Sequence, residues 1–530
     1  MLYSLNESED NGQFWVNILC RMKFKGGVFV AGKDARIKHN LISSLVYQIV
    51  LLSLSFLLPR LYLDNFGSEV NGVLSTIKQI FAYLTLLEAG VGLATTQALY
   101  KKIGEKDYPS VNAVLSATDS YYKRTGFIYL AIVLLIAVVY SFVIPTSIDS
   151  GTVFILIILT ALPSLFSFLV QAKYRILMEV DGRKYVINNA ETVLQIASNV
   201  GKILVLLLSD SLILIQLVYC VLSLTQLVYL YLYAKRRYKW LDLHTVPDFN
   251  AISQKNSVLM HQLSGMVFNN TDVILISLLC DFKAASIYAI YNMFFSQVQN
   301  FITSMVSSFT FALGQMFHTD REKFNRLYHA YETCYIMGTY FVYTLMAVFL
   351  LPLIQIYTSG IDDAEYTNVW LVFLFVLMNL AANTKLPSHG IIEYAGEFEK
   401  TRSHAFWEMI INLVVSVVAI MFLGICGAII GTLAALVFRG VLVIAYANKD
   451  VLHRTQMCTY KIVIANLAVF IIVMAVFFVD AFSGLPFWKL LVCGMLHTVW
   501  IGVLYVLVNL LLNRSAFKYM LEMLWSRKKQ

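Results

Sequence analysis

Charged side chains are scarce in this sequence of 530 residues. Asp, Glu, Lys and Arg together make up 14% of it, whereas apolar types make up 59%. A soluble protein of this length usually has about 25% charged residues and under half apolar ones. A soluble core cannot bury this much apolar surface, but a bilayer can. The composition therefore predicts an integral membrane protein.

Motifs that would mark a catalytic or metal-binding protein are also missing. The 8 prolines are too few for Pro-rich linkers, and the 7 cysteines are scattered without a C-x-x-C pair, so neither a zinc site nor a disulfide framework can be read. The 9 histidines show no H-E-x-x-H spacing, and no G-x-x-x-x-G-K-[ST] phosphate loop is present. We expect no enzyme activity, no catalytic residue, no metal and no cofactor.

Long apolar runs are the dominant feature of what is present. Runs of roughly 20 residues, the length that an α-helix needs to cross a bilayer, recur from about residue 40 to about residue 512. We predict about fourteen transmembrane helices joined by short connections, and hence an all-α polytopic membrane protein. Residues 1–36 show no cleavable signal peptide. The predicted spans are 40–62, 70–100, 122–145, 152–177, 186–208, 211–234, 254–280, 284–314, 330–357, 366–393, 403–424, 427–447, 461–480 and 488–512.

Lysine and arginine residues are distributed unevenly between the two sets of loops. If the N-terminus is cytoplasmic, the cytoplasmic loops and the two tails hold 33 of the 40 Lys and Arg residues. By the positive-inside rule, we predict an even number of spans with both termini in the cytoplasm. These loops also account for the net charge of +8, so nucleic acid is not an expected partner. The other seven are Arg60, Lys283 and Lys489 in external loops and Lys78, Lys202, Lys385 and Arg439 within spans.

The chain divides into two halves of six spans and two added spans. We predict a cytoplasmic N-terminal segment (1–36), an N-lobe (37–240), a C-lobe (241–450), two further helices (451–512) and a basic cytoplasmic tail (513–530). Residues 64–80 resemble residues 281–297 in pattern, and Tyr122 occupies the position of Tyr335 in the second half. Both copies enter from an even-numbered loop, which predicts a parallel repeat. Transporters built this way hold the substrate between the halves.

Four segments carry a family resemblance. They read RLYLDNFG at 60–67 followed by Glu69, Asn71 and Gly72, YLTLLEAGVG at 83–92, LYKK at 99–102, and NNTDVILI at 269–276. This pattern resembles the polysaccharide transporter family, the Wzx-type flippases of the multidrug/oligosaccharidyl-lipid/polysaccharide (MOP) superfamily. Fourteen spans with short loops also match, so the resemblance extends over about residues 37–512.

The resemblance implies two six-helix lobes arranged as a V around a central cavity, with spans 13 and 14 at the side. It also implies the cargo, an undecaprenyl-diphosphate-linked oligosaccharide that is flipped across the bacterial cytoplasmic membrane. Such a flippase serves the assembly of capsule, O-antigen or another cell-surface polysaccharide. The expected partners are the lipid-linked oligosaccharide, membrane lipids, a polysaccharide polymerase and glycosyltransferases.

Four cations lie within the predicted spans: Lys78, Lys202, Lys385 and Arg439. A charged side chain at the centre of a lipid-exposed helix costs roughly 2.5–3.5 kcal/mol on insertion scales, so these four must face a wet cavity or a partner. Because they come from both predicted lobes, we predict that they bind the diphosphate-sugar head group, with Arg60 at the end of span 1. The alternatives are ion pairs with buried acids, snorkelling of Lys202, and an interfacial anchor at Arg60.

We identify Asp272 and Glu88 as the intramembrane acids. Asp272 lies at about the depth of Lys78, which leaves two interpretations open: a salt bridge between the lobes, or coupling to a proton or sodium gradient. Asn269 and Asn270 would add polar ligands one turn away. Glu88 would bind a cation or hold the helix turn.

Span 10 is interrupted by polar residues together with Pro387 and Gly390. A proline frees a backbone carbonyl and bends a helix, and such irregular backbone is tolerated at membrane depth only beside protein or a water-filled cavity. One interpretation is a hinge that lines the transport path. The other is that the span ends near Asn383 and a cytoplasmic loop follows. Pro163 in span 4 is another hinge candidate.

The aromatic content is high, with 31 Tyr and 35 Phe. Sugars stack on aromatic faces, so Tyr288 and Tyr291 in span 8 are candidates for contact with the cargo. An interfacial belt explains most such residues without a function.

Two other functions stay open. A MATE-like drug efflux pump coupled to a cation gradient should line its cavity with acids, whereas here the cations outnumber the acids that we identify within spans. A membrane-embedded polysaccharide polymerase or ligase usually needs a large external loop with catalytic groups. The longest external loop here, about residues 358–367, is short and acidic. The flippase is therefore the leading prediction.

Overall fold

The computed structural model describes residues 31–143, 146–209, 211–252, 271–397, 400–476, 482, 484–514 and 516–517. Within these residues the regular structure is helical, and no β-strand occurs. A helix satisfies its backbone hydrogen bonds internally, which is what a bilayer demands of a spanning segment. The predicted fold class, an all-α polytopic membrane protein, is confirmed.

The helices follow one another with short connections. In the N-lobe they are α2 (Ala31–Leu84), α3 (Leu86–Gly104), α4 (Tyr108–Val143), α5 (Ser150–Phe166), η1 (Ser167–Gln171), α6 (Ala172–Val180), α7 (Lys184–Leu208) and α8 (Leu212–Arg237), with η2 (Asn250–Ile252) in the linker that follows. The C-lobe holds a helical segment at 271–279, then α10 (Phe282–Thr319), α11 (Arg321–Tyr357), α12 (Val369–Thr384), α13 (Leu386–Ala395), α14 (Arg402–Leu423), α15 (Ile425–Tyr446) and η3 (Ala447–Val451). Two added helices are α16 (Met457–Val476) and α17 (Phe487–Leu512).

Nine helices in the described part of the chain are long and apolar enough to cross a membrane. They correspond to predicted spans 3, 4, 6 and 9–14. The other five predicted spans fall on α2, on the α2–α3 pair, on α7, on a stretch that lies mostly outside the described residues (254–280), and on α10.

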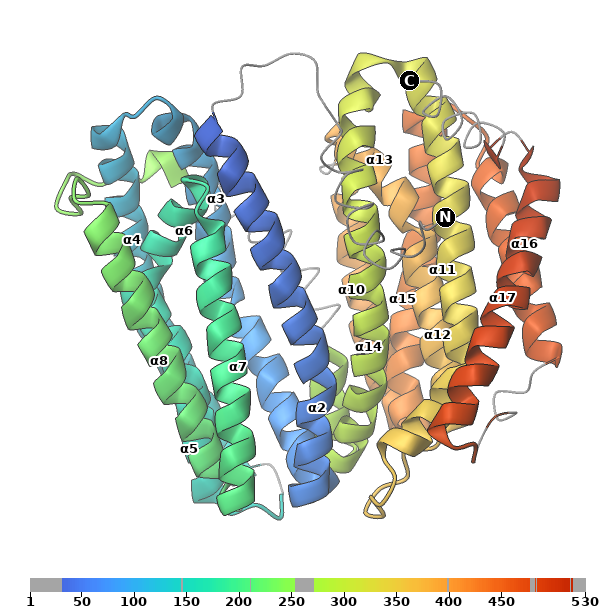
Figure 1. Ribbon diagram of the computed structural model, residues 1–530, viewed down its shortest axis with the longest axis horizontal. Helices are drawn as coiled ribbons and strands as arrows, with labels where there is room; N and C mark the ends of the chain where they lie inside the picture. Colours follow the sequence, from blue (N-terminus) through green and yellow to red (C-terminus); the bar gives the residue numbers. More distant parts are fainter. Residues whose placement is uncertain are drawn as a thin grey trace, which may run out of the picture.

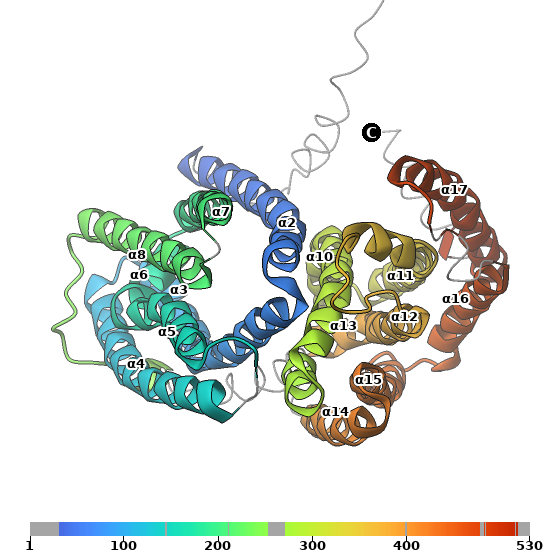
Figure 2. The same ribbon diagram turned by 90° about the horizontal axis from the view of Figure 1, so that it is seen from below.

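The helices form two lobes that lie side by side (Figures 1 and 2). The lobes approach each other at the end that carries the α11–α12 loop, drawn lowest in Figure 1, and separate toward the other end. We name these the converging end and the diverging end. α2 packs against α10 across the boundary between the lobes. α16 and α17 pack on α11, on the side of the C-lobe away from the N-lobe.

The boundary between predicted spans 1 and 2 is not a loop. The two helical parts of α2 meet there directly at Gly67, which has a non-helical backbone with φ of 78° and ψ of −178°. A positive φ is accessible to glycine without the steric cost that other residues incur. The chain can therefore change direction at the converging end within a single residue. The connection between predicted spans 1 and 2 is therefore shorter than the gap between their predicted bounds.

Predicted span 2 is in turn broken near its middle. α2 ends at Leu84 and α3 begins at Leu86. Thr85 between them donates its backbone N–H to the carbonyl oxygens of Phe81 and Ala82, both at 3.2 Å, and its hydroxyl to Ala82 (2.7 Å). The side-chain hydroxyl thus competes for the helix carbonyls at the break.

Candidate functional site

Arg60 in α2 joins the two lobes at the converging end. Its Nη1 and Nη2 atoms donate hydrogen bonds to the backbone carbonyl oxygens of Tyr357 (2.5 Å) and Ser359 (2.7 Å), and Nη2 lies 2.9 Å from a carboxylate oxygen of Asp64. The hydroxyl of Tyr357 donates to the carbonyl oxygen of Phe56 (2.6 Å). The guanidinium for which we predicted cargo binding is therefore occupied by the C-lobe in this state.

A network of hydrogen bonds lies beside Arg60. Asp363 in the α11–α12 loop accepts from the backbone N–H (2.7 Å) and the hydroxyl (2.6 Å) of Ser68. The Tyr366 hydroxyl donates to Ser68 Oγ (2.7 Å) and shares a hydrogen bond with the hydroxyl of Ser286 (2.9 Å), to which the Asn71 amide donates (2.7 Å). We name these five residues and the arginine the clasp. Because its members come from both lobes, the clasp closes the converging end.

Close packing holds the same end together. A Cβ atom on Gly72 of α2 would lie 1.8 Å from the backbone carbonyl oxygen of Phe282, the first residue of α10. Asp281 caps α10 by accepting a hydrogen bond from the Ala284 N–H (2.6 Å), which fixes where this helix begins. The two segments whose sequence patterns match therefore meet at the boundary between the lobes.

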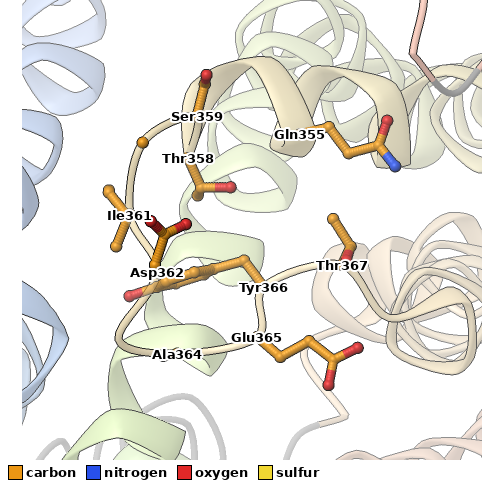
Figure 3. A pocket seen from close by; sticks show the side chains of 10 residues that line it. Gln355, Thr358, Ser359, Ile361, Asp362, Ala364, Glu365, Tyr366 and Thr367 are labelled. Carbon is orange, nitrogen blue, oxygen red and sulfur yellow. The ribbon is translucent and has the colours of Figure 1, made fainter.

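The α11–α12 loop encloses a pocket of about 410 Å³ at the converging end (Figure 3). Asp362 and Glu365 make its lining acidic. An anionic head group would be repelled there, so the pocket is not a candidate for the phosphate site. The lining residues are Gln355, Thr358, Ser359, Gly360, Ile361, Asp362, Ala364, Glu365, Tyr366 and Thr367.

Two of the cations with a predicted role in cargo binding lie together in the N-lobe. Lys78 in the second half of α2 has an exposed side chain, and α2 packs against α7, the helix that carries Lys202. The Lys202 ammonium lies 4.9 Å from the centre of the Tyr219 ring, a cation–π contact. The salt bridges formed by the described residues involve other cations. An anion held between these two ammonium groups would relieve their repulsion.

The other two cations share one acid in the C-lobe. Lys385, between α12 and α13, pairs with Oε1 of Glu408 in α14, and Nη1 of Arg439 in α15 lies 3.5 Å from Glu408 Oε2. The side chains of Lys385 and Glu408 are each 14% exposed and that of Arg439 is 8% exposed. The four cations therefore form two groups, one in each lobe.

Asp272 lies in a buried polar group built from four helical segments. Its Oδ2 accepts hydrogen bonds from the hydroxyls of Tyr288 in α10 (2.8 Å) and Thr432 in α15 (2.9 Å), and the Asn412 amide of α14 donates to Thr432 Oγ1 (2.8 Å). The Oδ1 atoms of Asp272 and Asn412 are buried without a hydrogen-bond partner. No described cation pairs with Asp272, so the salt bridge to Lys78 that we considered is not formed in this state.

Three residues of the predicted ion-coupling set fall outside the description. Asn269 and Asn270 lie outside the described residues, and Glu88 belongs to α3 but its side chain is not among those described. Their predicted roles stay predictions.

Two interpretations of the sequence are wrong. Tyr288 and Tyr291 lie in the C-lobe core, 4% and 0% exposed, and are closed to a sugar. Asp272 and Glu88 are not the full set of intramembrane acids, since Glu332 in α11 and Glu408 lie inside predicted spans and are paired with cations. Reading each span for acids as well as for cations would have found both glutamates.

Span 10 continues past Pro387, so the alternative in which it ends near Asn383 is wrong. α12 stops at Thr384 and α13 starts at Leu386, with Pro387 in the first turn of α13. Proline is tolerated in a first turn because the N–H that it lacks would have no helical acceptor there. The helix is therefore broken at Lys385, which is one of the candidate cations.

The other two hinge candidates also lie in irregular or short helical segments. Gly390 lies within α13, where an added Cβ would meet the Tyr394 hydroxyl at 3.5 Å. Pro163 lies in α5, and its carbonyl oxygen accepts from the N–H of Ser167, where the π-helical turn η1 begins. π-turns often occur at functional sites. Whether any of these residues moves during transport stays a prediction.

No family model matches the sequence, and no curated protein matches it. Solved structures do resemble the fold. The lipid II flippase MurJ in an inward closed conformation aligns with a TM-score of 0.65 over 90% of this chain and 99% of that chain, at 16% identity. A multidrug resistance MATE family transporter of the MOP superfamily aligns in an inward-facing conformation (TM-score 0.55, 11% identity, 80% of this chain and 98% of that chain) and in an outward-facing one (0.53, 14%, 81% and 96%). At these identities the likeness concerns the fold, and the chain has the fold shared by MOP superfamily transporters.

Proposed function

We propose that this chain is a flippase that moves a diphosphate-linked oligosaccharide on a polyprenyl lipid across the membrane, as the resemblance to the polysaccharide transporter family implies. The observation that carries the proposal is the pair Lys78 and Lys202, two ammonium groups in transmembrane helices with no salt bridge among the described residues. Holding such charges in a bilayer is unfavourable unless they face water or an anion. A diphosphate supplies that anion, while the lipid tail stays in the bilayer.

The charge of the loops indicates which end of the molecule faces the cytoplasm. The diverging end carries the loops rich in Lys and Arg, and the converging end carries Arg60, Lys283 and Lys489. By the positive-inside rule the diverging end faces the cytoplasm. The clasp then closes the external side, and the molecule is in an inward-facing state that would accept cargo from the cytoplasmic leaflet. Opening of the clasp, with closure of the diverging end, would complete alternating access for delivery to a polymerase outside.

Replacing both N-lobe lysines should abolish transport. In Lys78→Ala/Lys202→Ala we expect the flipping rate of a fluorescent polyprenyl-diphosphate oligosaccharide in proteoliposomes to fall at least tenfold. A hydrogen bond to a charged group contributes about 1.5–3 kcal/mol, and tenfold corresponds to about 1.4 kcal/mol. Lys239→Ala, which removes an exposed lysine of the linker, is the matched control and should flip at the wild-type rate. Equal rates for all three proteins would contradict the proposal.

The polar group around Asp272 supports a second part of the proposal, coupling to a cation. Two buried oxygens without partners, Asp272 Oδ1 and Asn412 Oδ1, lie beside the hydroxyl of Thr432. Buried acceptors of this kind are costly unless a donor or cation reaches them. Oxygen atoms of this kind suit a hard cation such as sodium, and the carboxylate alone suits a proton. Movement of either ion down its gradient would then drive the lobes between states.

Asp272→Asn should uncouple transport from the gradient. The amide keeps an oxygen that can accept hydrogen bonds but loses the negative charge that would hold a cation. We expect wild-type protein in proteoliposomes to flip cargo several times faster under an imposed sodium or proton gradient, and the variant to show the same rate with and without it. Asp242→Asn, in the exposed linker, should respond like wild type. A variant that still responds to the gradient would exclude Asp272 as the coupling residue.

A further inference from the structure

Glu408 pairs with two cations, Lys385 and Arg439, that a phosphate group could also bind. Its two carboxylate oxygens face different partners, Oε1 the ammonium of Lys385 and Oε2 the guanidinium of Arg439 at 3.5 Å. One negative charge thus stands between two positive ones.

Glu408 leaves hydrogen-bond donors of Arg439 without a partner. The distance of 3.5 Å allows an ion pair but is too long for a good hydrogen bond, and the Nε and Nη1 atoms of Arg439 have no acceptor although they are buried. Buried donors that lack a partner are unfavourable. Guanidinium groups bind carboxylate and phosphate oxygens through paired N–H donors. Arg439 therefore has unused capacity for an anion with more oxygens than a carboxylate.

The acid lies on a different element from Lys385, one of its two cations. Glu408 belongs to α14, which packs mainly against α15, whereas Lys385 occupies the break between α12 and α13. A rotation of the Glu408 side chain would release both cations without unfolding a helix. An anion that took the place of the carboxylate would offset this release.

We infer that the Glu408 carboxylate is an internal substitute for the phosphate of the cargo, and that it sets a charge threshold for binding. The inference rests on the proposed function. In the empty protein Glu408 occupies the C-lobe cations; a diphosphate head group displaces it. A lipid head group with a single negative charge gains little by replacing a carboxylate of equal charge. Glu408 thereby keeps the singly charged phospholipids of the surrounding bilayer out of the site.

The test is a competition on the full chain in nanodiscs of neutral lipid. A fluorescent polyprenyl diphosphate is the bound probe, and phosphatidylglycerol, which has one negative charge, is the competitor. In Glu408→Gln we expect phosphatidylglycerol to displace the probe at a concentration at least tenfold lower than in wild type. Glu397→Gln is the matched control: this glutamate lies in the loop after α13 and pairs with Lys400 at 2.9 Å. It should leave the displacement concentration unchanged.

An unchanged or higher displacement concentration in Glu408→Gln, with a native melting temperature, would overturn the inference. If Glu408→Gln fails to fold, Lys385→Gln is compared with Lys385→Gln/Glu408→Gln, in which the deleted charges balance. A lower displacement concentration in the double variant supports the inference, and equal values overturn it. Wild-type protein that binds polyprenyl diphosphate no better than neutral polyprenol would instead refute the proposed function.

Discussion

Gly72→Ala should open the converging end and stop transport. The new Cβ would lie 1.8 Å from the carbonyl oxygen of Phe282, 2.6 Å from its carbonyl carbon and 3.1 Å from its Cα, all backbone atoms that no rotamer change can move away. α2 must therefore retreat from α10. Overpacking of this kind usually costs about 1–3 kcal/mol. The clasp spans the same boundary, so its hydrogen bonds would be stretched or lost.

The measurement is a distance between spin labels across the converging end. Labels on cysteines at Asn65 in α2 and Asp362 in the α11–α12 loop, both exposed, would report the separation of the lobes in a background without the native cysteines. We expect a longer distance in Gly72→Ala and a loss of flipping. Gly338→Ala is the control, because a Cβ at this position of α11 meets no atom within 4 Å. A wild-type distance in Gly72→Ala would contradict the prediction.

Much of the fold could be predicted because each transmembrane span is recognisable from its own stretch of sequence. An apolar run of sufficient length needs no partner to be recognised, and the alternation of loop charge fixes the order of the spans. The predicted span boundaries differ from the structure where a single residue, and not a loop, turns the chain. The kink at Gly67 turns the chain within a single residue, because its φ of 78° is open to glycine.

The site could be predicted only in part. The type of a residue can be read at its own position, whereas the residues that it contacts lie far away in the sequence. Lys78, Lys202, Lys385 and Arg439 were found from charge at membrane depth. Arg60 was also found, but its acceptors lie nearly 300 positions along the chain, at Ser359 (299 residues away) and Tyr357 (297). Pattern alone does not indicate such a pairing. The clasp could therefore not be predicted from the sequence, although two of its residues, Arg60 and Asn71, belong to the motifs that carry the family resemblance.

Acids at matching positions of the two lobes support the repeat seen in the sequence. Asp119 lies three residues before Tyr122, and Glu332 lies three residues before Tyr335. Asp119 pairs with Lys173 in α6 and with Lys123 at 2.9 Å, and the carboxylate of Glu332 lies 2.6 Å from Arg454. Each acid thus fixes the start of a corresponding helix, α4 or α11, to a neighbouring element. The same structural task recurs in both halves with different partners.

Glu332→Ala should be the most destabilising of the substitutions considered. The Glu332 carboxylate is fully buried; it accepts from Arg454 at 2.6 Å and from the Thr459 hydroxyl at 2.7 Å. The side chain of Arg454 is only 21% exposed, so its charge would be left largely buried without a counter-ion. Removing one partner of a buried pair costs about 3–5 kcal/mol. The free energy of unfolding, measured by titration with a denaturing detergent in mixed micelles, should fall by about that amount.

The control is a second ion pair on the same helix. Glu322 and Arg326 in α11 lie 2.5 Å apart, but their side chains are 80% and 65% exposed. Exposed pairs contribute about 0.2–1 kcal/mol, so Glu322→Ala should change the free energy of unfolding by no more than that. The two glutamates differ by ten positions in the sequence and bear the same charge; burial alone separates their effects. A similar loss in both variants would show that Glu332 does not anchor α11 to the segment before α16.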